Sequence, residues 1–404
     1  MSTEQVMQTT VKDKLQDAWH EFFYANEGHK LYDRTLVILC GCLLVIGLLM
    51  VVSASMPVAS KLYDNPLHFA IRHIFYIVLS GIVITVAVQV PMQWWKDKNP
   101  YLLLLAFALL VLVLLIGKTV NGSTRWLALG PINIQAAEPA KLFFFCYLAG
   151  YLVRKEQEVK ENIKGFIKPL AVFFFLALLL LLQPDLGTVI VMFMTTVGLL
   201  FLAGSKLVQF FGLFMAGCSA VVALILLEPY RLRRVTSFLD PWSDPFGSGY
   251  QLTQSLMAYG RGDWFGMGLG NSIQKMHFLP EAHTDFVFAV LAEETGFIGV
   301  LTVIVIMFLL VGKILALGNR AMKSERLFEG YFAFAIGIWM SFQTFVNIGA
   351  SAGMLPTKGL TLPLVSYGGS SLLVMSLALA AILRIDYELR IEKVQATRKR
   401  KGSK

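Results

Sequence analysis

Ten apolar runs constrain this chain more than any other feature, because most of them are long enough to cross a membrane as a helix. About 20 mostly apolar residues span the ~30 Å hydrocarbon core of a bilayer. The chain is 56% hydrophobic and 15% charged, whereas a soluble domain carries about 25% charged residues. We therefore predict an all-α polytopic membrane protein with about ten transmembrane helices. The ten runs are residues 35–56, 68–90, 101–117, 134–153, 167–183, 186–203, 207–227, 285–316, 328–350 and 365–384.

Basic residues between the runs predict the orientation of the helices. Lysine and arginine collect in residues 91–100, 154–166 and 317–327, and by the positive-inside rule these segments face the cytosol. The basic residues after Arg384 agree, and an even number of spans places both termini in the cytosol. This asymmetry accounts for the net charge of +9, so we predict no nucleic-acid partner.

The runs and the charges divide the chain into three parts. Residues 1–34 form a cytosolic segment, which is either a disordered tail or an amphipathic helix on the membrane surface. Its apolar residues at helical spacing are Leu15, Trp19, Phe22 and Phe23. Residues 35–384 form one membrane domain, whose one large loop, residues 228–284, lies on the periplasmic side between the seventh and eighth helices. Residues 385–404 form a basic cytosolic tail.

The most conspicuous polar stretch is Leu279–Phe286, at the end of the large loop. It holds Glu281, His283 and Asp285 where the eighth apolar run begins. A carboxylate at the surface of a membrane domain is a functional hypothesis. The alternative is that Asp285 caps the following helix by accepting a hydrogen bond from a backbone N–H, and the stretch alone does not decide between the two.

Two further outer segments carry charged residues next to apolar runs. Arg125 and Trp126 follow a turn signal and suit a phosphate or a sugar face, although an interfacial tryptophan beside an arginine would give the same pattern. Glu138 and Lys141 lie three residues apart at the start of the fourth run, where each can neutralise the other. This pair is either structural or a mark of a polar cavity. Asp185, between the fifth and sixth runs, is expected to cap the sixth helix.

The large loop and the last outer loop hold further candidates for anion binding. Three arginines, Arg231, Arg233 and Arg234, open the large loop on the side where the positive-inside rule does not expect them. They fit phosphate oxygens or an acidic partner protein. Lys358 leads to a stretch rich in glycine and serine, residues 366–371, which includes Ser370 and serves either close packing or the binding of a diphosphate. Residues 251–259 have the pattern of a short helix.

Several unusual motifs occur together in one order: DPFGSGYQLTQS, GLGNSIQK, LPEAHTDF and PLVSYGGSS. Between Tyr32 and Arg390 the chain resembles the SEDS family of shape, elongation, division and sporulation proteins, and it is more similar to the division branch than to the elongation branch. The resemblance implies a peptidoglycan glycosyltransferase that polymerises lipid II at the outer face of the bacterial inner membrane, at the division septum. It also implies a class B penicillin-binding transpeptidase and other divisome membrane proteins as partners, besides membrane lipid.

The resemblance assigns roles to individual positions. It implies that the essential aspartate of the family is Asp285, that its loop tryptophan is Trp126, and that its intramembrane acid and base are Glu138 and Lys141. The family usually has a proline two residues before this glutamate, whereas here Ala136 stands there and Pro139 follows the glutamate. Because proline is tolerated in the first turn of a helix and not in its interior, we expect the fourth helix to begin later.

The implied reaction needs a base that takes a proton from a sugar hydroxyl, and the candidate is Asp285. A free aspartate has a pKa of about 3.9, so the site must hold the carboxylate dehydrated, with His283 as a neighbour that tunes it. The leaving diphosphate needs positive charge. Its candidate sources are Arg125, Lys358, the loop arginines and a divalent ion, Mg²⁺ or Mn²⁺; no other cofactor is expected.

Two other functions remain open from the sequence. A lipid II flippase would use Glu138, Lys141 and Glu293 to line a path across the membrane. A non-catalytic scaffold would use the arginines of the large loop and the N-terminal segment to dock divisome proteins. Both alternatives leave lipid II chemically unchanged, whereas a polymerase does not.

Overall fold

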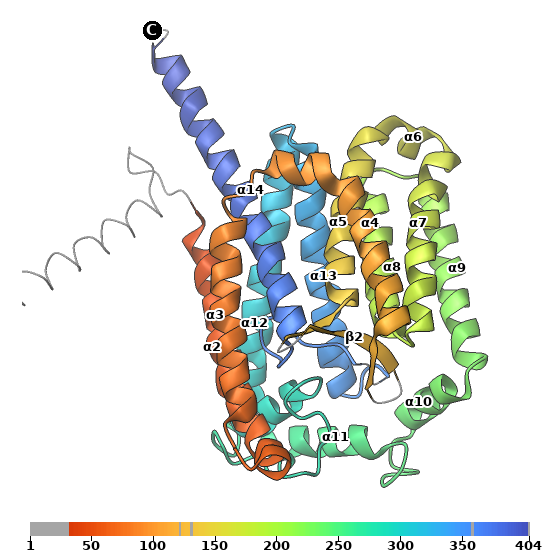
Figure 1. Cartoon of the computed structure of the whole chain (residues 1–404), viewed down its shortest axis with the longest axis vertical. Coiled ribbons are helices and arrows are strands. Elements are labelled where there is room, and N and C mark those ends of the chain that lie inside the picture. The colour runs from red at the N-terminus through yellow and green to blue at the C-terminus, as the bar shows by residue number, and fades with distance from the viewer. Residues whose placement is uncertain (1–31, 121–122, 130–131, 357–358, 403–404) are drawn as a thin grey trace, which may run out of the picture.

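The chain folds into a bundle of long helices that run roughly parallel to one another (Figure 1). A computed structural model describes residues 32–120, 123–129, 132–356 and 359–402. The bundle helices are α2 (Arg34–Tyr63), α3 (His68–Ala87), α4 (Met92–Ile116), α5 (Ala137–Arg154), α7 (Ile163–Leu182), α8 (Leu186–Leu202), α9 (Leu207–Leu226), α12 (Val287–Lys323), α13 (Leu327–Ser351) and α14 (Gly369–Gly402).

Seven of these helices are long and apolar enough to cross a membrane, namely α2, α3, α4, α7, α9, α12 and α13. The apolar helix α8 is shorter, and α5 carries Glu138, Lys141 and Arg154. Large apolar side chains on the outside of the bundle are exposed, for example Leu115 and Phe308, each at 75%. Such surfaces suit contact with lipid and would be unfavourable in water. The chain is therefore a multi-pass membrane protein.

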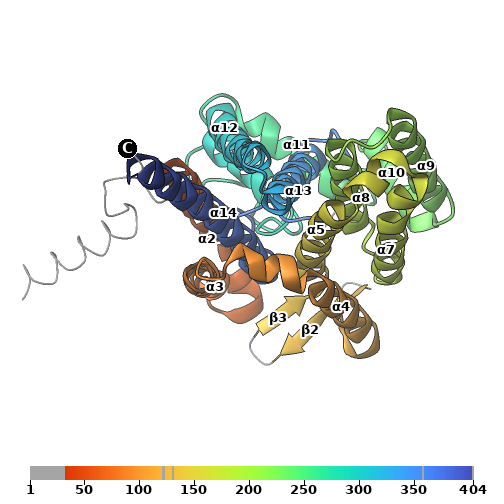
Figure 2. The ribbon, with the colours of Figure 1, turned by 90° about the horizontal axis from the view of Figure 1, so that it is seen from above.

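The loop between α4 and α5 corrects the all-α prediction. It forms a three-stranded antiparallel sheet of β1 (Lys118–Val120), β2 (Ser123–Leu129) and β3 (Ile132–Gln135). In the pairing of β2 with β3, Trp126 lies opposite Gln135 and Leu127 lies opposite Ile134. The sheet lies beside the end of α4 (Figure 2). On β2, Leu127 is buried between the half-buried Trp126 and the exposed Ala128, as expected where successive side chains point to opposite faces. The strand is too short for this pattern to be recognised in the sequence.

Two helices occupy the large loop, α10 (Pro229–Leu239) and α11 (Tyr250–Gly262). The short helix predicted at residues 251–259 is confirmed by α11, which packs against α12 with Leu252 and Ala258 buried. A short helix, α6 (Glu156–Glu161), joins α5 to α7 at the opposite end of the bundle.

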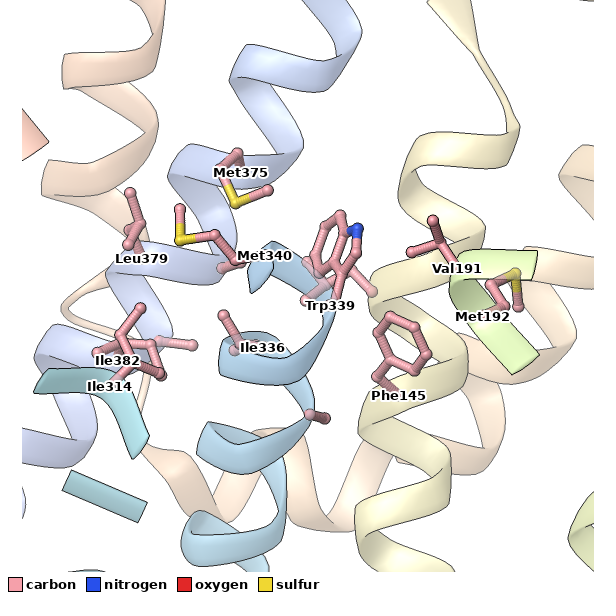
Figure 3. Close-up of a cluster of buried hydrophobic side chains, with 14 of the residues drawn as sticks. Phe145, Val191, Met192, Ile314, Ile336, Trp339, Met340, Met375, Leu379 and Ile382 are labelled. Atoms are coloured by element: carbon pink, nitrogen blue, oxygen red, sulfur yellow. The ribbon is translucent and has the colours of Figure 1, made fainter. Parts of the chain in front are cut away.

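The core lies where α5, α8, α12, α13 and α14 meet (Figure 3). Trp339 of α13 is fully buried, and its ring centroid lies 5.7 Å from that of Phe145 in α5. In contrast, α9 has no buried residue and lies at the edge of the bundle (Figure 2). The site described below is built on the packed helices and not on α9.

The end of the bundle predicted to be cytosolic is held by a buried carboxylate, Asp386 of α14. Its Oδ2 accepts from the backbone N–H of Asp33 (2.8 Å) and from Arg390 (2.7 Å), and its Oδ1 accepts from Arg320 (3.2 Å). Asp33 in turn caps α2 through the N–H of Thr35. The helix α14 continues beyond residue 384 without a break, so the predicted start of the tail is not a boundary in the backbone.

Candidate active site at the end of the large loop

Asp285 lies where the large loop meets α12, and its carboxylate does not cap that helix. The N-cap residue is Phe286, and the helix start has no side-chain cap within the described chain. The carboxylate is half-buried and makes no hydrogen bond with the residues that the structure describes. A Cβ added at Gly359 would lie 3.3 Å from Asp285 Oδ2, so the loop before α14 passes directly beside the carboxylate. The arrangement therefore does not match the capping alternative.

The surroundings of Asp285 raise its pKa to about 7. The largest cause is desolvation by the surrounding protein, followed by the negative charge of Glu281. The charges of Arg125 and Arg234 act in the opposite direction. A general base is most effective when its pKa lies near the working pH, and the protein surroundings give Asp285 this property without any direct ion pair to it among the described residues.

Two amide side chains on α13 hold the backbone around Asp285. The Asn347 Nδ2 donates to the carbonyl oxygens of Asp285 (2.9 Å) and Leu360 (2.6 Å). One helical turn away, Gln343 Nε2 donates to the carbonyl oxygen of Thr361 (2.9 Å). Both side chains are fully or almost fully buried. Neither residue was predicted from the sequence, although two amides four residues apart on one face of an apolar helix indicate a polar site.

The buried ion pair of α5, Glu138 with Lys141, is the other end of this network. Lys141 Nζ lies 2.9 Å from Glu138 Oε1 and 3.0 Å from Gln343 Oε1, and it lies over the ring of Trp339 at 5.0 Å from the centroid. The Trp339 Nε1 also donates to Gln343 Oε1 (2.7 Å). The buried pair in α5 is thereby connected through Gln343 to the loop segment that passes beside Asp285.

The unusual proline next to Glu138 does not displace this pair. The helix α5 begins at Ala137 and not at the predicted residue 134, so the expected later start is confirmed. Pro139 lies in the first turn, where its missing N–H costs no helical hydrogen bond. Glu138 and Lys141 therefore stay on the buried face of α5.

Arg125 fixes the small sheet to the turn between α7 and α8. Its Nε donates to the carbonyl oxygen of Gln183 (3.0 Å) and its second terminal nitrogen to that of Pro184 (2.6 Å). The adjacent Asp185 caps α8, as predicted, by accepting from the N–H (3.2 Å) and the hydroxyl (2.9 Å) of Thr188. Trp126 is half-buried on β2, and no interaction between described residues joins its side chain to Asp285.

His283 and Ser370 are engaged in contacts with the protein. The ring of His283 lies 4.7 Å from that of Phe69 and 5.6 Å from that of Tyr367, and its burial lowers its pKa. Ser370 accepts from the N–H of Gln135 (3.0 Å) and donates to the carbonyl oxygen of Asn133 (2.9 Å). Its hydroxyl thus holds β3 against α14.

The three loop arginines lie on α10. Of these, Arg234 acts on Asp285 through its charge, and Arg233 acts in the same way on Asp244. The side chain of Arg231 and the whole of Lys358 lie outside the described residues. Within the described part of the chain, no three His, Cys, Asp or Glu side chains are arranged to bind a metal ion, so we assign no residue to the divalent ion considered above.

The family is shown by comparison with known proteins. The model of the cell cycle protein family that comprises FtsW, RodA and SpoVE matches residues 34–391. The chain belongs to this family, in agreement with the resemblance of its motifs.

Relatives with high sequence identity indicate the branch of this family to which the chain is similar. A relative from Alteromonas naphthalenivorans, named probable peptidoglycan glycosyltransferase FtsW, is 69% identical over 365 residues, which are 90% of this chain and 71% of the relative. A relative of the same name from Escherichia coli O157:H7 is 55% identical and is covered to 88%, against 91% of this chain.

Solved structures share the fold. A chain of a peptidoglycan synthase complex that coordinates polymerization and crosslinking superposes with a TM-score of 0.72 at 29% identity, over 89% of this chain and 98% of that chain. The rod shape determining protein RodA of Thermus thermophilus superposes with a TM-score of 0.65 at 26% identity, over 88% and 96%.

Proposed function

We propose that this chain is a peptidoglycan glycosyltransferase that polymerises lipid II into glycan strands during septal wall synthesis, with Asp285 as the general base. The observation that carries the proposal is the state of Asp285: a half-buried carboxylate with a pKa of about 7, no hydrogen bond from the described residues, and a backbone carbonyl group that Asn347 holds. Its relatives are named as peptidoglycan glycosyltransferases.

In the proposed reaction, a hydroxyl oxygen of the acceptor sugar forms a bond to the anomeric carbon of the donor. The bond from that carbon to the undecaprenyl diphosphate breaks, and the hydroxyl proton moves to Asp285. A single displacement inverts the anomeric centre. The positive charges of Arg125 and Arg234 act on this region and would stabilise the negative charge of the departing diphosphate. Arg125 does so from a fixed position, because two backbone carbonyl groups hold it.

The proposed topology has ten membrane spans, with the three shorter or more charged helices α5, α8 and α14 added to the seven that meet the length and hydropathy criteria. Both termini and the basic segments then face the cytosol, and the large loop, the sheet and Asp285 face the periplasm. At this surface the enzyme meets lipid II in the outer leaflet. A class B transpeptidase is the proposed partner, since a structural neighbour belongs to a complex that combines polymerization with crosslinking.

The test is polymerisation of lipid II by the purified chain, alone and with its transpeptidase. The glycan products are separated by gel electrophoresis. The parent protein is expected to form polymer, and Asp285→Asn is expected to reduce the rate by about 100-fold or more, in the range that general bases contribute. Unchanged lipid II with the parent protein under both conditions would favour a flippase or a scaffold instead.

A further inference from the structure

The helix that follows Asp285 is interrupted at Gly296, within its outer part. This residue has φ 67° and ψ −167°, a backbone conformation that strongly favours glycine. In an unbroken α-helix the N–H of Phe297 would donate to the carbonyl of Glu293, and that of Ile298 to the carbonyl of Glu294. Both donors point elsewhere here, so the interruption frees two donors and two acceptors.

A segment of the large loop, residues 263–268, takes up all four groups. The N–H groups of Phe297 and Ile298 donate to the carbonyl oxygens of Asp263 (2.8 Å) and Trp264 (3.2 Å). The carbonyl oxygens of Glu293 and Glu294 accept from the N–H groups of Met267 (2.9 Å) and Gly268 (3.0 Å). We call residues 263–268 with residues 293–298 the splice. Its four hydrogen bonds replace two that an uninterrupted helix would make.

Glycine makes this close approach possible. A Cβ at Gly266 would lie 2.2 Å from the carbonyl oxygen of Glu294, and one at Gly296 would lie 2.4 Å from the backbone nitrogen of Gly266. Both distances are far below van der Waals contact. Side chains at these positions would therefore push the two backbone segments of the splice apart.

The side chains of Glu293 and Glu294, both buried, extend the attachment. Glu293 accepts from Arg261 (3.0 Å) and from the backbone N–H groups of Ile273 (3.0 Å) and Gln274 (3.2 Å). Glu294 accepts from Lys275 Nζ (2.7 Å) and from the hydroxyl of Ser53 in α2 (2.6 Å). The loop is thus bound to α12 by backbone and side-chain contacts together.

These contacts fix the chain on both sides of Asp285. Upstream, Lys275 is bound to Glu294; downstream, residues 287–294 form a helical segment that is buried at every position. Resting on the function proposed above, we propose that Gly296, Gly266, Glu293 and Glu294 are positioning residues. The splice sets the place of the loop that carries Asp285, and its loss moves the carboxylate without removing it.

The experiment compares Gly296→Ala with Gly312→Ala, both in α12. A Cβ at Gly312 meets no atom within 4 Å, so this control variant is expected to match the parent. Alanine at 296 clashes with the loop and favours a continuous helix. In proteoliposomes that contain the chain and its transpeptidase, Gly296→Ala is expected to lower kcat by about 100-fold, as a displacement of about 1 Å does. The KM for lipid II is expected to stay within about twofold, because the change moves the base and not the binding surface.

A second readout separates positioning from a general loss of structure. The pH dependence of kcat should shift to lower pH in Gly296→Ala, since the carboxylate leaves surroundings that raise its pKa. If this variant cannot be purified, Glu293→Gln keeps the volume of the side chain and removes its ion pair with Arg261. It is then expected to show the same shift with a fall in kcat of about tenfold. Faster amide hydrogen exchange in residues 263–275, with unchanged exchange in α13, would support the inference.

The positioning role would be overturned by a Gly296→Ala or Glu293→Gln variant that is folded, as judged by amide hydrogen exchange, and has the parent kcat and the parent pH profile. This conclusion requires that Asp285→Asn is inactive. If Asp285→Asn is as active as the parent, the proposed function fails instead, so the two failures are distinguishable.

Discussion

Two buried ion pairs lie on the two sides of Asp285, and they are built in different ways. Glu138 and Lys141 are three residues apart on one helix, whereas Lys275 and Glu294 join the large loop to α12. Both lysines are almost completely buried. The first pair is set by local geometry, and the second exists only after the loop has docked. Two ion pairs that are equally buried can therefore differ in how well apolar side chains replace them.

The largest expected effect comes from removing one charge of either pair. Lys141→Met and Lys275→Met each leave a buried carboxylate without its cation, which costs about 3–5 kcal/mol. Thermal or denaturant unfolding in detergent micelles measures this cost. For the pair in α5, the double variant Glu138→Leu/Lys141→Met is expected to recover most of the stability, because apolar residues can replace such a pair. Gln343 Oε1 loses its contact with Lys141 but keeps the hydrogen bond from Trp339 Nε1.

For the pair in the loop, the double variant Lys275→Met/Glu294→Leu is expected to recover less. Lys275 also donates to the carbonyl oxygen of Gly270 (2.7 Å) and to Ser53, and an apolar side chain leaves these acceptors unpaired. Equal recovery of stability in the two double variants would contradict the predicted difference between the two ion pairs.

A smaller effect is expected at Asn347, which joins α13 to the backbone carbonyl groups of Asp285 and Leu360. Asn347→Leu leaves the buried carbonyl oxygen of Leu360 without this donor, at about 1–3 kcal/mol. It also removes the partly buried hydrogen bond to the carbonyl oxygen of Asp285, and is expected to lower polymerisation more than binding of lipid II. Thr344→Val is the matched control on α13, because the Thr344 hydroxyl is buried and has no partner among the described residues. Equal activity of the two variants would show that the hydrogen bonds of Asn347 do not matter for the reaction.

A last effect concerns the pH dependence of stability, to which Asp285 is expected to contribute. Its folded pKa of about 7 lies above the unfolded value of about 3.9, so the native state binds the proton more tightly. This contribution to stability is complete below pH 4 and is lost as the pH rises to about 7. The difference between parent and Asp285→Asn in unfolding experiments from pH 4 to 8 isolates it. A difference that does not vary with pH would contradict the raised pKa.

Sequence reasoning succeeded where contacts are local. The apolar runs predicted the helix bundle, the spacing of Glu138 and Lys141 predicted their ion pair, and Asp185 was correctly expected to cap α8. The ion pair and the cap each depend on residues within one helical turn, and each apolar run is one continuous segment.

Prediction from the sequence failed where contacts join segments that are distant along the chain. The splice pairs residues about 30 positions apart, and Gln343 and Asn347 bind loop carbonyls that follow α13. The small sheet was missed because its strands, such as β2 (Ser123–Leu129), are short and their pairing is tertiary. Polar residues inside apolar helices were visible in the sequence, but their partners were not.

The most direct test of the central claim is the rate of lipid II polymerisation by the purified complex of this chain and its transpeptidase, measured for the parent and for Asp285→Asn from pH 5 to 9. We expect the parent rate to rise with pH through about 7, as the carboxylate of Asp285 loses its proton, and the variant to be nearly inactive at every pH. A folded variant that polymerises at the parent rate with the same pH profile would contradict the assignment of Asp285 as the base.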